Sequence, residues 1–269
     1  MSDRSFLFVP GNRPERFDKA CSAGADVVII DLEDAVAPPE KAAAREAVRR
    51  WLTPDKSVHL RLNAADTEWF DDDLALVNAD GVRGVVLPKA ESADHISEIQ
   101  RRSGSAPRIM PIIETARGLW KALEIASASG VERLAFGSVD FQLDTGIHGE
   151  REELLFARSQ LVLVSRVAGR LPPVDGVTVA LDDEALLVDD VARARSLGFG
   201  GKLCIHPKQV ATINVGFLPP AAEVAWARQV VEAAARSGDN AARVDGKLID
   251  RPIINRARAI LAIVERPRS

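Results

Sequence analysis

The chain has 269 residues, enough for one large domain or two small ones. Hydrophobic residues make up 46% of it, which is enough for an ordinary hydrophobic core and argues against a disordered protein. The formal net charge is -4 and no basic block occurs, so neither nucleic acid nor a membrane surface is an expected partner. Two cysteines, Cys21 and Cys204, are too few for a disulfide framework or a cysteine-based zinc site. Without a membrane-length apolar run or a signal-peptide pattern, the expected location is cytoplasmic.

Short runs rich in Val, Ile and Leu alternate with stretches of helical periodicity. Eight runs have the composition of strands covered on both faces: 6–10, 26–33, 58–63, 84–89, 108–114, 133–140, 175–180 and 201–207. Helical stretches between them include 38–52, 116–129, 152–169 and 182–198. This alternation predicts an α/β fold, a (β/α)8 TIM barrel over residues 1–215. A nucleotide-binding open sheet is disfavoured, because the first turn, PGNRPER, has neither GxGxxG nor GxxxxGK[ST].

The remaining residues, 216–269, hold more helix than a barrel needs to close. A helix is predicted within 217–238, a turn or short extended piece at 243–250 and a final helix at 251–266. We interpret this segment as a C-terminal helical extension that packs on a neighbouring subunit. A plain closing helix is the alternative.

Polar residues end the predicted strands, which are otherwise apolar. In a barrel of this kind the carboxyl ends of the strands face the catalytic mouth. The residues at those ends are Asp31, Glu33, Asp34, Arg61, Asn63, Lys89, Glu114, Asp140 and His206. Their convergence predicts an active site at that end of the barrel.

Glu114 and Asp140 end the fifth and sixth predicted strands and form a candidate site for a hard cation. Two carboxylates can hold Mg²⁺ while waters and substrate oxygens complete its octahedron. Mg²⁺ is favoured over Zn²⁺ because no His or Cys pair stands at ligand spacing. The alternative is that each carboxylate caps the helix that follows its strand.

Arg61 and Lys89 are the basic candidates at the strand ends. The planar fork of Arg61 suits capture of a substrate carboxylate, with Asn63 pointing the same way; an ion pair with Asp31, Glu33 or Asp34 is the alternative. Lys89 is a candidate substrate-binding residue, as are Asn63 and Glu114. A strand-end lysine can also form a Schiff base with a ketone, although an ion pair with nearby acids is the commoner role.

A further basic group follows the first strand. Arg13, Arg16 and Lys19 lie at helical spacing and bind the phosphates of a long cofactor tail or form a solvated helix face. His206 either shapes a binding pocket or completes the barrel rim. These four are the candidate cofactor-binding residues.

Eight motifs together make the chain similar to the citrate lyase β-subunit family of the HpcH/HpaI aldolase superfamily, which includes malyl-CoA and citramalyl-CoA lyases. In order they are FLFVPGNRPERF, DVVIIDLEDAV with PEKAAAR, RLN, VVLPKAES, IIETARG, LAFGSVDFQLDTG, GKLCIHPKQ and VDGKLID-P. A single motif such as RLN is weak evidence of a family, but eight motifs in the same order along nearly the whole chain are specific evidence.

The resemblance implies a barrel, usually trimeric, that needs Mg²⁺ and cleaves a carbon–carbon bond. It assigns the metal to Glu114 and Asp140 and the substrate carboxylate to Arg61. It also implies that Asp250 of the tail motif reaches a neighbouring subunit's site and acts in acid/base chemistry. Glu33 or Asp34 is a candidate to take the proton of the substrate hydroxyl, directly or through a water.

Three functions remain open from the sequence. The first is a Mg²⁺-dependent lyase that acts on a 3-hydroxy-acyl-CoA thioester such as malyl-CoA, citramalyl-CoA or a citryl thioester. The second is a Mg²⁺-dependent aldolase on a free 2-oxo acid. The third is a subunit of citrate lyase β type that works only with an acyl-carrier partner.

Overall fold

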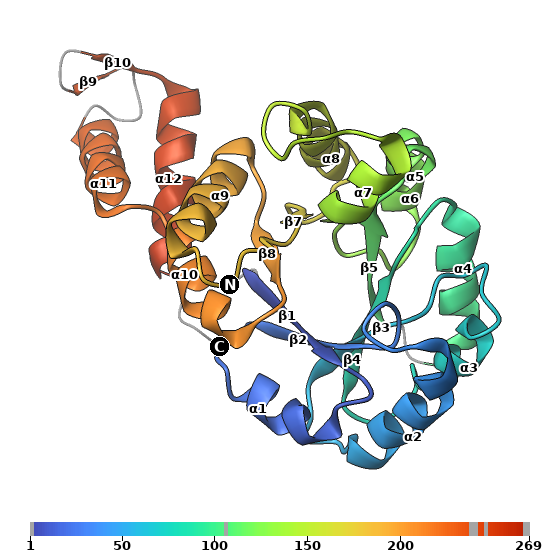
Figure 1. Ribbon diagram of the computed structural model, residues 1–269. Helices are drawn as coiled ribbons and strands as arrows, with labels where there is room; N and C mark the ends of the chain where they lie inside the picture. The colour runs from blue at the N-terminus through green and yellow to red at the C-terminus, as the bar shows by residue number, and fades with distance from the viewer. Residues whose placement is uncertain (1–2, 105–106, 237–241, 245–246, 266–269) are drawn as a thin grey trace. The chain divides into compact units, whose positions relative to one another are not determined.

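The computed structural model describes residues 3–104, 107–236, 242–244 and 247–265. Eight parallel strands close into a barrel in chain order, with β8 returning to β1 (Figure 1). They are β1 (Ser5–Pro10), β2 (Val27–Asp31), β3 (Val58–Arg61), β4 (Val82–Leu87), β5 (Arg108–Ile113), β6 (Ala135–Phe136), β7 (Val174–Asp175) and β8 (Gly201–Cys204). The predicted (β/α)8 fold is confirmed.

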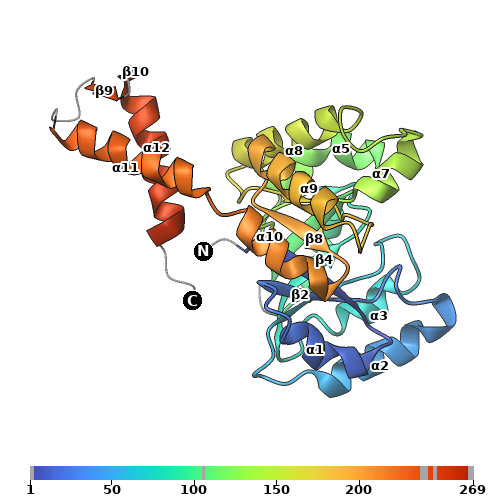
Figure 2. The same ribbon diagram turned by 60° about the vertical axis from the view of Figure 1, so that its left-hand side comes forward.

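Helices occupy the connections between the strands and lie around the outside of the barrel (Figures 1 and 2). The α-helices of this part are α1 (Phe17–Cys21), α2 (Lys41–Trp51), α3 (Phe70–Leu74), α4 (Ala93–Arg102), α5 (Ala116–Trp120), α6 (Ala122–Ser127), α7 (Ser138–Thr145), α8 (Leu155–Val167), α9 (Glu184–Leu197) and α10 (Val210–Gly216). Three single turns of 3-10 helix precede α1, α2 and α10: η1 (Pro14–Arg16), η2 (Pro38–Glu40) and η3 (Pro207–Gln209).

Short polar residues fix where several of these helices begin. The side chains of Ser92, Thr115 and Asp183 accept a hydrogen bond from a backbone N–H in the first turn of α4, α5 and α9. Such caps satisfy N–H groups that have no partner inside the helix. Gly146 and Gly198 end α7 and α9 in the left-handed conformation, which glycine adopts without a steric penalty.

Alternate strand residues fill the barrel interior with apolar side chains. The inner cluster consists of Phe6, Val27, Ile29, Val86, Met110, Ile112, Ala135, Val174 and Leu203, with Phe8 and Val177 packed against it. Because the side-chain period of a strand is two, the next inward position after Ile29 is Asp31. The interior is therefore apolar along most of its length and becomes charged where the strands end.

Strands β6 and β7 are shorter than the sequence predicts. Helix α7 begins at Ser138, one residue after Gly137, so the predicted strand 133–140 keeps only two residues. In the predicted strand 175–180, side chains take the place of ladder partners. Lys202 donates to the carbonyl of Gly176 at 2.6 Å and Gln209 to that of Thr178 at 2.8 Å.

The chain divides into two compact units, residues 2–214 and 215–269. The second unit holds helices α11 (Ala221–Arg236) and α12 (Arg251–Glu265), with the antiparallel pair β9 (Ala242–Val244) and β10 (Lys247–Ile249) between them in the chain. The helices pack through a small apolar core of Ala227, Val230, Ala234, Ile249, Ile254, Ala257 and Ile260. Both predicted tail helices are confirmed, and packing of this unit on a neighbouring subunit stays a prediction. Within the described ranges, no helix is both long and apolar enough to cross a membrane.

His59 of β3 lies in the interior beside Gly84 of β4. A Cβ at Gly84 would come within 2.6 Å of the His59 ring, so only glycine leaves room for this imidazole. Burial, assisted by the charges of Arg108 and Arg133, lowers the pKa of His59 to about 4. The ring is therefore neutral at neutral pH.

The low pKa of His59 is expected to make the folded protein less stable as the pH falls. The unfolded chain binds a proton at this residue near pH 6.5, whereas the folded chain binds it only near pH 4. Lowering the pH through this window therefore favours unfolding, by about 3 kcal/mol once both states are protonated. Denaturant unfolding from pH 7 to pH 4.5 should show a steeper loss of stability in the wild type than in His59→Gln. Parallel curves for the two proteins would contradict the assignment.

Candidate active site

A cavity of about 440 Å³ opens at the carboxyl ends of the strands. We call it the mouth cavity. Its charged lining residues are Asp31, Asp34, Arg61, Glu114 and Asp140. The rest of its wall is mainly apolar, formed by Phe8, Pro10, Ala35, Ile112, Phe136, Gly137, Ser138, Val139, Val177, Val179, Leu203 and Ile205. Four acids and one guanidinium thus line a cavity whose wall is otherwise mainly apolar.

Arg61 is held by the acids of the loop after β2. Its Nε and Nη2 donate to the two carboxylate oxygens of Asp31 at 2.7 and 2.6 Å, a bidentate pair. Its Nη1 lies 2.9 Å from Glu33 Oε2 and 3.4 Å from Asp34 Oδ2. Burial opposes the charge, but Asp31, Glu33 and Asp34 raise the pKa of Arg61 above its ordinary value. Arg61 thus makes the ion pairs considered from sequence and also lines the cavity.

Glu33 is buried and does not line the mouth cavity. Its Oε1 accepts a hydrogen bond from Lys89 Nζ at 2.9 Å. Burial, followed by the charge of Asp34, raises the pKa of Glu33 to about 7 even though Arg61 and Lys89 lower it. A carboxyl group with such a pKa can exchange a proton near neutral pH. Asp34, in contrast, has a half-exposed side chain and faces the cavity directly.

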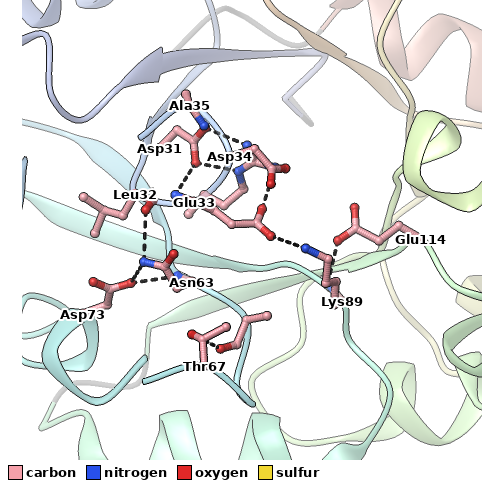
Figure 3. A network of polar contacts seen from close by, with 12 residues as sticks. Asp31, Leu32, Glu33, Asp34, Ala35, Asn63, Thr67, Asp73, Lys89 and Glu114 are labelled. Atoms are coloured by element: carbon pink, nitrogen blue, oxygen red, sulfur yellow. Dashed lines mark hydrogen bonds and ion pairs between the residues drawn. The ribbon is translucent and has the colours of Figure 1, made fainter. Parts of the chain in front are cut away.

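The loop after β2, which carries these acids, is anchored by hydrogen bonds from two side chains. Lys41 at the start of α2 is buried, and its Nζ donates to the carbonyls of Leu32 and Glu33, each at 2.8 Å. Asn63 donates its side-chain amide to the carbonyl of Leu32 at 3.0 Å and to Asp73 at 2.6 Å (Figure 3). Asn63 does not line the mouth cavity. We infer that it orders this loop and that it does not contact substrate.

Glu114 directly follows β5, and its buried carboxylate belongs to the mouth cavity. Its Oε1 accepts the backbone N–H of Lys89 at 2.7 Å. Gly137 makes space for it, because a Cβ at that position would lie 2.3 Å from Glu114 Oε2. Burial and the charge of Glu33, with a smaller effect of Asp140, raise the pKa of Glu114 to about 8. Crowded carboxylates of this kind are stabilised by a bound cation.

Asp140 lies on the first turn of α7 and lines the same cavity. The sequence placed it at the end of a strand, which is wrong because α7 begins at Ser138. Neither carboxylate caps a helix: Thr115 caps α5, and the position before α7 is Gly137, whose helix has no side-chain cap. Among the described residues, the Asp140 carboxylate has no hydrogen-bond donor or ion-pair partner. Both expected metal-binding residues therefore reach one cavity with oxygens free to bind.

The donor set at this point suits a small hard cation. No cluster of three or more His, Cys, Asp and Glu side chains that could hold a metal occurs within the described ranges. A pair of carboxylates is what Mg²⁺ commonly takes from a protein, and it keeps several waters. Glu114 and Asp140 fit that pattern and offer no soft ligand for Zn²⁺.

Lys89 follows β4 by two residues and does not line the mouth cavity. It lies between Glu33 and Glu114 (Figure 3). Burial lowers its basicity, but the hydrogen bond and charge of Glu33 outweigh this and raise the pKa of Lys89. A lysine that stays protonated is a poor nucleophile, so this environment disfavours a Schiff base.

A second cavity, of about 540 Å³, adjoins the first along β1. We call it the basic cavity. Arg16, Lys19, His206 and Lys208 contribute its polar lining, and three residues of its wall, Phe8, Pro10 and Ile205, are shared with the mouth cavity. Arg13 is not among the lining residues and instead pairs with Glu15 at 2.7 Å.

Asp250 lies in the second compact unit, exposed, at the start of α12. Its Oδ1 accepts the backbone N–H of Ile253 at 3.3 Å, so it caps that helix. Residues 245–246 of the tail motif lie outside the described residues. The role expected for Asp250 in a neighbouring subunit's site stays a prediction.

Some residues of the site carried no signal that sequence reasoning used. Lys41 falls in the motif PEKAAAR, where it reads as a solvated helix residue. Lys208 falls in the motif GKLCIHPKQ, and Gly137 is the first residue of GSVDF. Only the three-dimensional contacts give these residues a role.

Comparison with known proteins identifies the family of the chain. A family model described as HpcH/HpaI aldolase/citrate lyase matches residues 4–207. A citrate lyase subunit beta-like protein of Deinococcus radiodurans is 38% identical over 278 residues, which cover 96% of this chain and 96% of that protein. A (3S)-malyl-CoA thioesterase of Cereibacter sphaeroides is 35% identical, with 97% and 94% covered.

Solved structures give the same result. The CitE protein of Mycobacterium tuberculosis in complex with magnesium, acetoacetate and coenzyme A has a TM-score of 0.88 and 34% identity, covering 98% of this chain and 99% of that chain. A citrate lyase beta subunit of the same organism, complexed with oxaloacetate and magnesium, has a TM-score of 0.73 and 34% identity, covering 81% and 98%. The predicted resemblance is confirmed: the chain belongs to the HpcH/HpaI aldolase/citrate lyase family, a family of lyases of the oxo-acid-lyase type.

Proposed function

We propose that this protein is a Mg²⁺-dependent lyase that cleaves, or in reverse forms, the carbon–carbon bond of a 3-hydroxy-acyl-CoA thioester such as malyl-CoA or citramalyl-CoA. The products are a 2-oxo acid and a shorter acyl thioester. The observation that carries the proposal is the meeting of Arg61, Glu114 and Asp140 in one cavity that adjoins a second, basic cavity.

Glu114 and Asp140 would hold the metal. When bound, Mg²⁺ would supply positive charge to the carboxylate and hydroxyl oxygens of the substrate, which makes the hydroxyl more acidic. Arg61 binds the substrate carboxylate through Nη1, the guanidinium nitrogen that its bidentate pair with Asp31 does not use, and the substrate there competes with Glu33 and Asp34. Because Asp31 fixes the orientation of the guanidinium, the carboxylate is held in one pose.

Proton transfer falls to the remaining acids. Asp34, or a water held between Asp34 and Glu33, takes the proton of the substrate hydroxyl. The carbon–carbon bond then breaks, its electron pair passes to the thioester fragment as an enolate, and the hydroxyl carbon becomes the carbonyl of the 2-oxo acid. Asp250 of a neighbouring copy in a homotrimer gives a proton to the enolate carbon. The resemblance described above supports this last assignment.

The basic cavity supports a substrate with a long phosphorylated arm. Lys19, Lys208 and Arg16 supply cations for phosphate groups. Because the two cavities share three wall residues, we infer that one long molecule extends from one cavity to the other. A relative in this family has been crystallised with coenzyme A. A free 2-oxo acid would leave the basic cavity empty, so an aldolase without a thioester is less well supported.

The deciding experiment is an assay of the purified protein, alone and with Mg²⁺, on malyl-CoA and citramalyl-CoA. Release of glyoxylate or pyruvate together with an acyl-CoA supports the proposal. Release of free CoA with no 2-oxo acid indicates a thioesterase, as in the Cereibacter relative. Activity that appears only with an acyl-carrier protein indicates a citrate lyase subunit. In parallel, CoA should raise the melting temperature.

Glu114→Gln and Asp140→Asn should each weaken Mg²⁺ binding by at least about tenfold. Each variant removes one of two hard oxygens and keeps side-chain size, so the fold should persist. Isothermal titration calorimetry without substrate measures this directly. The control is Glu152→Gln, an exposed acid before α8. Wild-type affinity in either site variant would refute the assignment.

Arg61→Lys should lower kcat/KM by about 100-fold. Lysine keeps the charge but loses the planar fork, so it cannot face Asp31 and the substrate carboxylate in one fixed orientation. Steady-state kinetics measure the effect, and the melting temperature reports any loss of the ion pair with Asp31. Near-normal kinetics would assign Arg61 to structure alone.

Lys89 should form no imine during turnover. Borohydride added with pyruvate or glyoxylate should leave the protein mass unchanged, because Lys89 is protonated and paired with Glu33. EDTA should abolish activity and Mg²⁺ should restore it. A trapped adduct at Lys89 together with EDTA-resistant activity would point to a Schiff-base aldolase.

A further inference from the structure

Lys89 has a backbone conformation that no other non-glycine residue shares among the described residues. Its φ is +46°, in the left-handed region that L-residues with a long side chain seldom enter. Such a conformation persists only where surrounding contacts enforce it, and those contacts are often functional. Two carboxylates supply them here (Figure 3).

The first contact is made by the main chain. The N–H of Lys89 donates to Glu114 Oε1 at 2.7 Å. No side-chain donor is paired with Glu114 within the described part of the chain, so this N–H is what orients its carboxylate. With Oε1 fixed, Oε2 remains at the space that Gly137 leaves open.

The second contact is made by the side chain. Lys89 Nζ donates to Glu33 Oε1 at 2.9 Å, while Arg61 Nη1 lies 2.9 Å from Glu33 Oε2. Glu33 is therefore held between two cations. Lys89 itself does not line the mouth cavity, and its side chain is 44% exposed, so its contacts with the site run through the two glutamates.

We propose that Lys89 is a positioning residue that orients two carboxylates with two different atoms. Its main-chain N–H sets Glu114, and its ammonium group sets Glu33. This inference rests on the proposed function, in which Glu114 holds Mg²⁺ and Glu33 takes part in proton transfer. It replaces the substrate-binding role that the sequence suggested for Lys89.

The two roles can be separated by choosing substitutions for their tolerance of positive φ. Asparagine and glycine adopt this conformation readily, alanine less so, and β-branched valine least. All four remove the ammonium group. Lys89→Asn and Lys89→Gly should therefore keep the N–H on Glu114, whereas Lys89→Val should turn it away.

Two measurements test the proposal. In titration calorimetry with Mg²⁺ alone, Lys89→Asn and Lys89→Gly should bind within about threefold of wild type and Lys89→Val at least about tenfold more weakly, with Lys89→Ala between them. In kinetics at saturating Mg²⁺, all four should lose at least about tenfold in kcat with little change in KM, and Lys89→Arg should recover most of it. Lys121→Met, at an exposed lysine after α5, is the control.

The outcomes are distinct. Equal Mg²⁺ affinity in Lys89→Asn and Lys89→Val would overturn the main-chain role, and Lys89→Ala decides the same point if Lys89→Val does not fold. Normal kcat in Lys89→Asn would overturn the side-chain role. Both of these results leave the proposed function standing. A wild type that binds no Mg²⁺ would overturn the proposed function and the main-chain role together.

Discussion

One guanidinium holds together acids that would otherwise repel each other at the mouth of the barrel. Arg61 grips Asp31 with two hydrogen bonds and lies within ion-pair distance of Glu33 and Asp34. Isolated surface ion pairs contribute little to stability, but here the arginine and two of the acids, Asp31 and Glu33, are largely removed from water. Removing the arginine would leave buried Asp31 without its ion-pair partner and buried Glu33 with Lys89 alone. The shape of the site depends on this residue.

The surrounding fold gives this cluster its precision. Lys41 and Asn63 fasten the carbonyls of the acidic loop, and the N–H of Lys89 fastens Glu114. Lys41 begins α2, whereas Asn63 and Lys89 each follow the end of a barrel strand, β3 and β4. Carboxylates that are held in place by such contacts lose little conformational freedom when a ligand binds, which favours catalysis.

Much of this arrangement could be predicted from sequence, and the reason is the period of a strand. A polar residue that ends an apolar run must lie at the barrel mouth, which identified Arg61 and Glu114. The strand predicted to carry Asp140 was wrong, because the β-propensity of LAFGSVD gave no sign that a helix would begin at Ser138. The role of Lys41 could not be foreseen either, since whether a lysine is solvated or buried against carbonyls depends on packing between α2 and the loop after β2. Asn63 shares the strand parity of Arg61, yet β3 ends at Arg61, and parity no longer fixes the direction of a side chain beyond the end of its strand.

Phe8 and Pro10 belong to both cavities, and they lie two residues apart on β1. β1 cannot slide along the barrel, because its two neighbours, β2 and β8, both fix its register. In the proposed function, β1 would therefore fix the distance between the reacting end of a ligand in the mouth cavity and its anchored end in the basic cavity. A ligand whose arm is too short or too long would lose correct placement at the carboxylates even while its anchor remained bound, so chain length would be read out as turnover more than as affinity.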